Sequence, residues 1–78
     1  MIRILSGTKK QADDLARMLE IWPYEFIDNV DRIKGLDRGT TIFLYGDYQF
    51  RPDWKAMKIE MMCRNFKLFQ VARKQKFQ

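Results

Sequence analysis

The chain has 78 residues, of which 46% are hydrophobic and 32% are charged, and its formal net charge is +5. A chain of this length forms one domain with a small core, and this composition argues against intrinsic disorder. Its apolar runs are too short for a membrane span or a signal peptide. One cysteine and no histidine exclude an internal disulfide and a zinc site with several Cys or His ligands. We therefore expect a cytoplasmic protein.

The first third of the chain predicts a strand, a helix and a second strand. Residues 2–5 are apolar and β-branched, which predicts the first strand. Thr8 and Gln11 have capping-box spacing, and the apolar residues that follow predict an amphipathic helix over residues 9–21. Pro23 ends this helix, and residues 24–27 form the second strand.

The rest of the chain predicts a short helix, a strand, a longer helix and a last strand. Apolar residues in steps of three from Val30 to Leu36 predict the short helix. Residues 40–45 predict a central parallel strand with both faces covered, because their apolar side chains are consecutive. Pro52 suits the first turn of a helix that runs to about Asn65. Residues 66–71 predict a strand with lysines suited to a sheet edge.

Strands that alternate with helices predict a single α/β domain of three layers over residues 1–72, followed by a basic tail over residues 73–78. The element order is β-α-β-(α)-β-α-β. We expect a mostly parallel, Rossmann-like or flavodoxin-like sheet with strand order 2-1-3-4. The competing fold is a split α+β arrangement in which the second or fourth strand is antiparallel.

A parallel sheet delivers the loops after its strands to one edge, where ligands bind between strands that flank the reversal of strand order. Here these loops are residues 6–10 and 46–48, and we expect them to be neighbours. The first loop offers Gly7, Thr8, Lys9 and Lys10 beside free helix N–H groups, which suits a bound anion. It matches neither the Walker A pattern nor GxGxxG, and it is more typical of an ordinary strand-to-helix turn with a capping box.

The second loop and the helix after it are rich in aromatic and basic residues. Tyr48 and Trp54 are suited to stacking on bases, and Arg51 and Lys55 to pairing with phosphates. The same residue types anchor protein interfaces. In a third interpretation Phe50 and Trp54 close the core, and Asp47 caps a turn.

The sequence gives little support to catalysis or to a bound cofactor. Without histidine the commonest general base is missing. Asp47 and Asp53 lie close in sequence and could hold Mg²⁺, but Asp53 is better explained by its position at a helix N-terminus. We expect Cys63 to be buried and inert, and the methionines, notably Met57, Met61 and Met62, to fill the core.

The net charge comes from one end of the chain. Residues 1–63 carry ten basic and ten acidic side chains, whereas residues 64–78 carry five basic side chains and no acid. Arg73, Lys74 and Lys76 make up the basic tail. Such a cluster is either an arm for nucleic acid or a solvated terminus.

Residues 32–69, "RIKGLDRGTTIFLYGDYQFRPDWKAMKIEMMCRNFKLF", resemble small uncharacterised bacteriophage α/β proteins. The shared features are a Gly-Leu turn, a "GTT" strand, an aromatic loop that ends in "RPDW", a helix and a final strand. The resemblance implies a viral accessory protein that acts on a host component in the host cytoplasm. It implies no catalytic residue.

Three functions follow from these patterns. The first is a module that binds nucleic acid or a nucleotide phosphate through the edge loops and the basic tail. The second is a protein-interaction module, such as an inhibitor of a host protein, that uses the aromatic loop or the strand over residues 66–71. That strand also allows a homodimer. The third is a small enzyme that uses Asp47 with a metal. Of these functions we expect binding rather than catalysis.

Overall fold

The structure, a computed structural model, describes residues 1–72. They form a four-stranded sheet of order β2-β1-β3-β4 in which every neighbouring pair is parallel. The elements in chain order are β1 (Ile2–Ser6), α1 (Lys9–Leu19), β2 (Tyr24–Phe26), α2 (Val30–Lys34), β3 (Thr41–Tyr45), a 3₁₀ helix η1 (Tyr48–Phe50), α3 (Trp54–Cys63) and β4 (Lys67–Val71). The predicted fold class and strand order are confirmed, and the antiparallel alternative is wrong for this chain.

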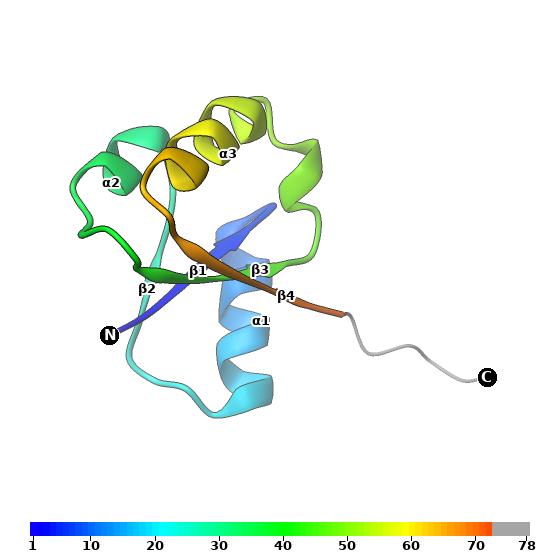
Figure 1. Cartoon of the computed structure of the whole chain (residues 1–78). Helices are drawn as coiled ribbons and strands as arrows, with labels where there is room; N and C mark the ends of the chain where they lie inside the picture. The colour runs from blue at the N-terminus through cyan, green and yellow to red at the C-terminus, as the bar shows by residue number, and fades with distance from the viewer. Residues whose placement is uncertain (73–78) are drawn as a thin grey trace.

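The sheet is the middle of three layers. Figure 1 shows α1 on one face and α2 with α3 on the other, an arrangement typical of crossovers between parallel strands. Each face has its own core, since side chains alternate along every strand. The core under α2 and α3 is formed by Leu5, Ile27, Ile33, Ile42, Leu44, Tyr48, Met57, Met61 and Phe66. The core under α1 is formed by Ile4, Ala12, Leu15, Ala16 and Tyr45.

Helix α1 follows from the capping signal seen in the sequence. Thr8 has extended backbone angles, φ −142° and ψ 163°, and its side chain accepts a hydrogen bond from the Gln11 amide. The helix ends two residues earlier than predicted because Glu20 takes a left-handed conformation, with φ 56°. The N–H of Glu20 then bonds to carbonyls of the last turn, which stops the helix.

The segment between β3 and α3 differs from the prediction. Pro52 was expected in the first turn of the helix, but it lies in a turn, and α3 begins at Trp54. A 3₁₀ helix precedes that turn, and it contains Tyr48, which is only 5% exposed. Burial of this ring draws the chain toward the core before the helix starts.

Three expectations about burial, for Met62, Cys63 and Phe43, are also wrong. Met57 and Met61 are buried as predicted, but Met62 is 63% exposed and Cys63 is exposed as well. Both lie on the outer side of α3. On the strand β3, Phe43 is only half-buried although both faces were expected to be covered. No helix in the described part of the chain, residues 1–72, is long and apolar enough to cross a membrane.

Candidate functional site at the carboxyl edge of the sheet

The loops after β1 and β3 lie side by side, as predicted, and the side chain of Gln11 joins them. Its Oε1 accepts hydrogen bonds from the Gly7 amide at 2.9 Å and from the Asp47 amide at 3.0 Å. Its Nε2 donates to Asp47 Oδ2 at 2.8 Å. The glutamine of the predicted capping box therefore joins the two loops at the point where the strand order reverses.

This close approach requires glycine in both loops. A Cβ atom on Gly7 would lie 2.8 Å from Asp47 Cβ, which is too close for any side chain. Gly46 has φ +68°, a left-handed conformation that favours glycine, and a Cβ there would collide with the Gln11 amide. The two glycines therefore allow the loops to pack against each other. The sequence had instead suggested that Gly7 lets a bound anion approach the backbone.

The two lysines of the first loop are paired along α1. Lys9 Nζ lies 3.3 Å from Asp13 Oδ1 and 3.3 Å from the Tyr24 hydroxyl, and Lys10 Nζ lies 3.9 Å from Asp14. The Tyr24 hydroxyl also donates to Asp13. Because these ion pairs are exposed, they contribute little to stability and leave Lys10 open to solvent.

The trio of Lys9, Asp13 and Tyr24 perturbs the titration of its members. The hydrogen bond from Tyr24, with that from Lys9, holds the pKa of Asp13 below 3.8. Burial of the phenol, together with its bond to Asp13, raises the pKa of Tyr24 above 10.0. Hydrogen bonds to Tyr24 and Asp13 raise the pKa of Lys9. Across the neutral pH range Asp13 is therefore a carboxylate, Lys9 is an ammonium and Tyr24 is a neutral phenol.

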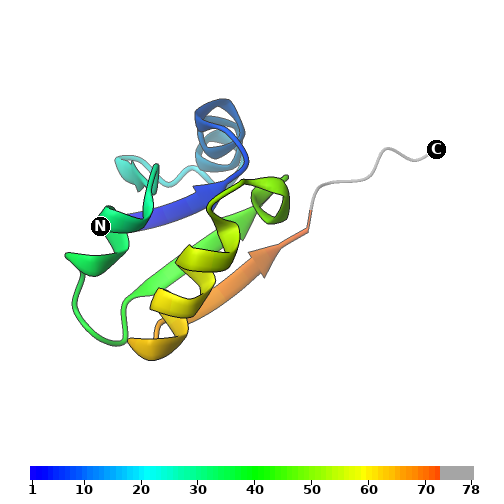
Figure 2. The ribbon, with the colours of Figure 1, turned by 90° about the horizontal axis from the view of Figure 1, so that it is seen from above.

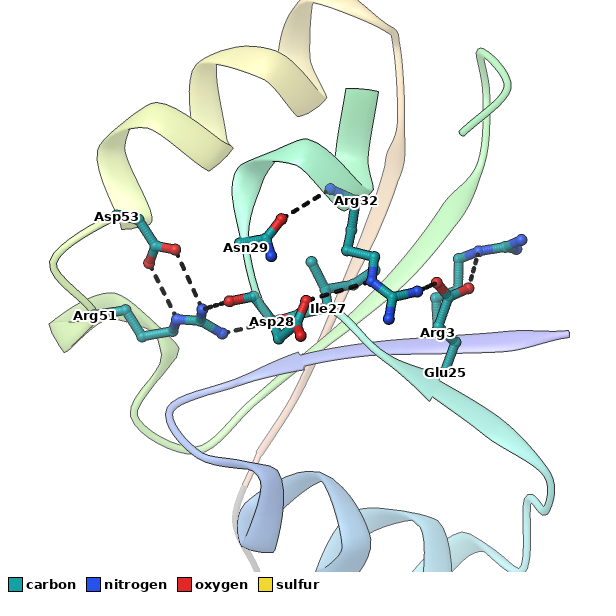
Figure 3. A network of polar contacts seen from close by, with 8 residues as sticks. All are labelled: Arg3, Glu25, Ile27, Asp28, Asn29, Arg32, Arg51 and Asp53. Carbon is teal, nitrogen blue, oxygen red and sulfur yellow. Dashed lines mark hydrogen bonds and ion pairs between the residues drawn. The ribbon is translucent and has the colours of Figure 1, made fainter. Parts of the chain in front are cut away.

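Arg51, expected to bind a phosphate, is bonded within the chain at all five of its N–H groups. Nη1 donates to the carbonyls of Ser6 at 3.2 Å and Ile27 at 2.9 Å. Nη2 donates to the Asp28 carbonyl at 2.8 Å and to Asp53 Oδ2 at 3.2 Å, and Nε donates to Asp53 Oδ1 at 3.1 Å. Figure 3 shows the bonds of Arg51 to Ile27, Asp28 and Asp53. A guanidinium has five donors, so none remains for a ligand.

Arg51 lies where the ends of two strands meet the start of α3 at the carboxyl edge of the sheet. Its side chain is 12% exposed, and its guanidinium lies 5.8 Å from the centre of the Phe26 ring. It ties the ends of β1 and β2 to the start of α3, and its two bonds to Asp53 form the strong bidentate geometry. We conclude that Arg51 supports the edge structurally.

A second polar network continues from this point along β2 (Figure 3). Glu25 accepts from Arg3 Nε at 3.1 Å and from Arg32 Nη1 at 2.8 Å. Arg32 Nε also lies 3.4 Å from Asp28 Oδ1. The β2 side of the sheet is therefore covered with paired charges.

The aromatic residues of the second loop separate into buried and exposed members. The Tyr48 ring packs edge-on against Trp54, with ring centres 4.9 Å apart, and both rings contact the core under α3. Neither ring stands free as a stacking platform. Phe50 was expected to close the core in one interpretation, but it is 82% exposed.

An open cleft of about 650 Å³ lies at this edge. Its walls are Gly7, Thr8, Lys9, Phe26, Asp47, Phe50, Arg51, Pro52 and Asp53. Four of the predicted site residues therefore line it, namely Gly7, Thr8, Lys9 and Arg51. Tyr48, Trp54, Lys10 and Lys55 lie outside the lining, and Lys55 is exposed on α3. Arg73, Lys74 and Lys76 of the predicted tail lie outside the described residues.

Sequence reasoning missed Phe26 and Phe50 as cleft residues and Gln11 as the link between the loops. The capping-box spacing of Gln11 was a usable signal, because it placed that side chain at the start of α1. Within residues 1–72, no group of three or more Cys, Asp or Glu side chains is arranged to hold a metal ion. Comparison with known proteins found no matching family model, no matching curated protein and no matching solved structure.

Proposed function

We propose that this chain is a small, non-catalytic module that binds a protein partner through the cleft at the carboxyl edge of the sheet. The observation that carries this proposal is the contrast at the cleft between Phe50 and Arg51. Phe50 exposes 82% of its surface, whereas every N–H group of Arg51 is bonded inside the chain. An exposed aromatic ring beside a cleft suits an interface anchor.

The chemistry of the cleft favours an apolar side chain as its ligand. Phe26, Phe50 and Pro52 supply apolar surface, while the charges beside them are paired. Lys9 is bonded to Asp13, and Asp53 is bonded to Arg51. A ligand that enters therefore meets apolar walls with a polar, internally neutralised rim, which is the usual anatomy of a protein interface.

Nucleic acid or a nucleotide phosphate is the second candidate ligand. It is favoured by the charge distribution, because residues 64–78 hold five basic side chains and no acid. Lys10 and Lys55 are exposed and remain available to phosphates, although neither lines the cleft. This binding would be electrostatic and would weaken steeply as salt is raised.

We further propose that the protein acts in the cytoplasm, as a phage-type accessory protein in a host cell. The single cysteine, the absence of a cofactor motif and the resemblance of residues 32–69 support this proposal. Its partner would then be a host protein, and its effect would come from occupying a surface of that protein.

The test is a selection of displayed random peptides on the full-length protein, followed by anisotropy with the enriched peptides. The variant is Phe50→Asp, and Met18→Asp is the matched control, since Met18 is 41% exposed near the other end of α1. We expect peptides with apolar anchors whose affinity falls about tenfold or more in Phe50→Asp and is unchanged in Met18→Asp. Failure to enrich any peptide that distinguishes these variants would contradict the proposal.

A parallel titration with labelled single- and double-stranded oligonucleotides tests the second candidate. It is run across a salt series on the full chain and on a variant with Arg73, Lys74 and Lys76 changed to Gln. Binding at physiological salt that the tail substitutions weaken would favour nucleic acid as the ligand. Absence of binding at low salt would remove that candidate.

A further inference from the structure

The strand β4 forms an open edge of the sheet (Figure 2). It pairs with β3 on one side, in the register Thr41↔Lys67 to Tyr45↔Val71. Among residues 1–72 no strand pairs with its other side. The Lys67 amide donates to the Thr40 carbonyl at 2.9 Å. Because backbone groups point alternately to the two sides of a strand, the N–H groups of Leu68 and Gln70 point outward.

An apolar strip runs beside this edge on the face that carries α1. Phe43 and Phe69 are direct partners on β3 and β4, and their rings meet edge-on with centres 6.0 Å apart. Phe69 is 55% exposed and Phe43 is half-buried. Helix α1 packs mainly against β1, β2 and β3, so its cover is centred away from β4. A strand that docks at β4 would therefore find both backbone partners and apolar contacts.

The charge of this region selects the partner. From Met61 to the end of the sequence there are five basic residues and no acid. Arg64 is paired with Glu60, and Arg73, Lys74 and Lys76 lie outside the described residues. Lys67 lies on β4 itself and is exposed. A second copy of the chain would bring another β4 with its own Lys67 and no acid against this edge, which is unfavourable. An acidic segment would be complementary.

We propose that the β4 edge accepts an extended, acidic segment of a protein partner as a fifth strand. The segment would pair its backbone with the outward N–H and C=O groups of Leu68 and Gln70, and its alternate apolar side chains would lie along Phe69 and Phe43. This is recognition by strand addition, in which backbone hydrogen bonds supply affinity and side chains supply specificity. The surface uses none of the cleft-lining residues, so it is independent of the cleft.

The experiment compares Gln70→Pro with Gln70→Ala in the full chain. Proline removes an outward N–H group and is tolerated on the solvent side of an edge strand, whereas alanine removes the side chain and keeps the N–H. Displayed random peptides are selected on the wild-type protein, and the enriched peptides are measured by anisotropy. We expect a class with acidic residues around alternating apolar ones. Its affinity should fall about tenfold in Gln70→Pro and be unchanged in Gln70→Ala and Phe50→Asp.

A second measurement acts on the peptide and leaves the protein unaltered. The enriched peptide is methylated at alternate backbone nitrogens, in each of the two possible registers. One register should abolish binding and the other should not, because only alternate N–H groups face β4. Circular dichroism is used to check that Gln70→Pro remains folded.

Three results would overturn the proposal. The first is a selection that yields no peptide sensitive to Gln70→Pro or to methylation. The second is a concentration-dependent dimer, seen by sedimentation, that Gln70→Pro abolishes, since the occupant would then be a second copy. The third is competition by oligonucleotides that replaces the peptide in a salt-dependent way. A selection that yields peptides sensitive to Gln70→Pro but none sensitive to Phe50→Asp would contradict the proposed function of the cleft. It would support strand addition at β4.

Discussion

The two edges of the sheet are built differently. At one edge β2 has only three residues, follows Pro23, and carries Glu25 in ion pairs with Arg3 and Arg32. At the other edge β4 has five residues, and within residues 1–72 no ion pair involves any of them. Short length, proline and fixed charge are the means by which proteins prevent strands from pairing with other chains.

The difference leaves the β4 edge without the protection that the β2 edge has. The end of β2 is also tied down by Arg51, which binds the carbonyls of Ile27 and Asp28. Nothing comparable among the described residues holds β4, whose Phe69 is 55% exposed. A chain with a core this small would gain from covering that ring, so we infer that its exposure serves an interaction.

The largest expected change in stability comes from proline substitutions on β4, which distinguish N–H groups that face β3 from those that face outward. Phe69→Pro removes an N–H group that faces β3, and it should lower the free energy of unfolding by about 2–3 kcal/mol. Gln70→Pro removes an outward N–H group and should cost less than about 1 kcal/mol. Urea denaturation followed by circular dichroism measures both.

Phe69→Ala is the control that separates loss of the ring from loss of the hydrogen bond. Equal destabilisation by the two proline variants would show that the outward direction assigned to Gln70 is wrong. The open edge, and the strand addition proposed for it, would then lose their structural basis.

The next effect concerns the protected edge. Arg51→Met leaves three backbone carbonyls and the Asp53 carboxylate without their donor, and it should lower the free energy of unfolding by about 2 kcal/mol. Arg51→Lys should recover only part of this loss, because an ammonium cannot reproduce the planar fork of a guanidinium. Thermal and urea unfolding measure the change.

Arg38→Met provides the matched control, since Arg38 is exposed and its loss should change stability by less than about 0.5 kcal/mol. If Arg51→Met were as stable as this control, the guanidinium would not be holding the ends of β1 and β2. Arg51 would then be free to serve a ligand, and the phosphate hypothesis would gain support.

The order of the strands could be predicted from the sequence because its signals are local. The capping box at Thr8 and Gln11 and the apolar run over residues 40–45 each define one element, and the rules for parallel crossovers then leave few arrangements. The meeting of the loops after β1 and β3 followed from the same rules.

The roles of individual side chains could not be predicted in this way. Arg51 is bonded to carbonyls of Ser6 and Ile27, which are far away in the sequence, and nothing near Arg51 indicates those partners. A local pattern of aromatic and basic residues therefore predicted a ligand site, whereas tertiary contacts had already used the arginine. Phe50 and Tyr48 are two positions apart, and only the turn of η1 decides which ring is buried.

The smallest expected effect tests the hydroxyl that links α1 to the protected edge. Tyr24 begins β2, and its hydroxyl donates to Asp13, which holds the pKa of that carboxyl below 3.8. A lowered carboxyl pKa contributes stability above pH 3.8 and loses it as the pH falls through the folded-state value. In Tyr24→Phe the pKa of Asp13 should rise toward 3.8, as followed by NMR titration of the carboxyl carbon. An Asp13 pKa that is the same in both proteins would mean that Lys9 and Arg17 lower it without the hydroxyl. The hydroxyl would then not help to fasten β2 to α1.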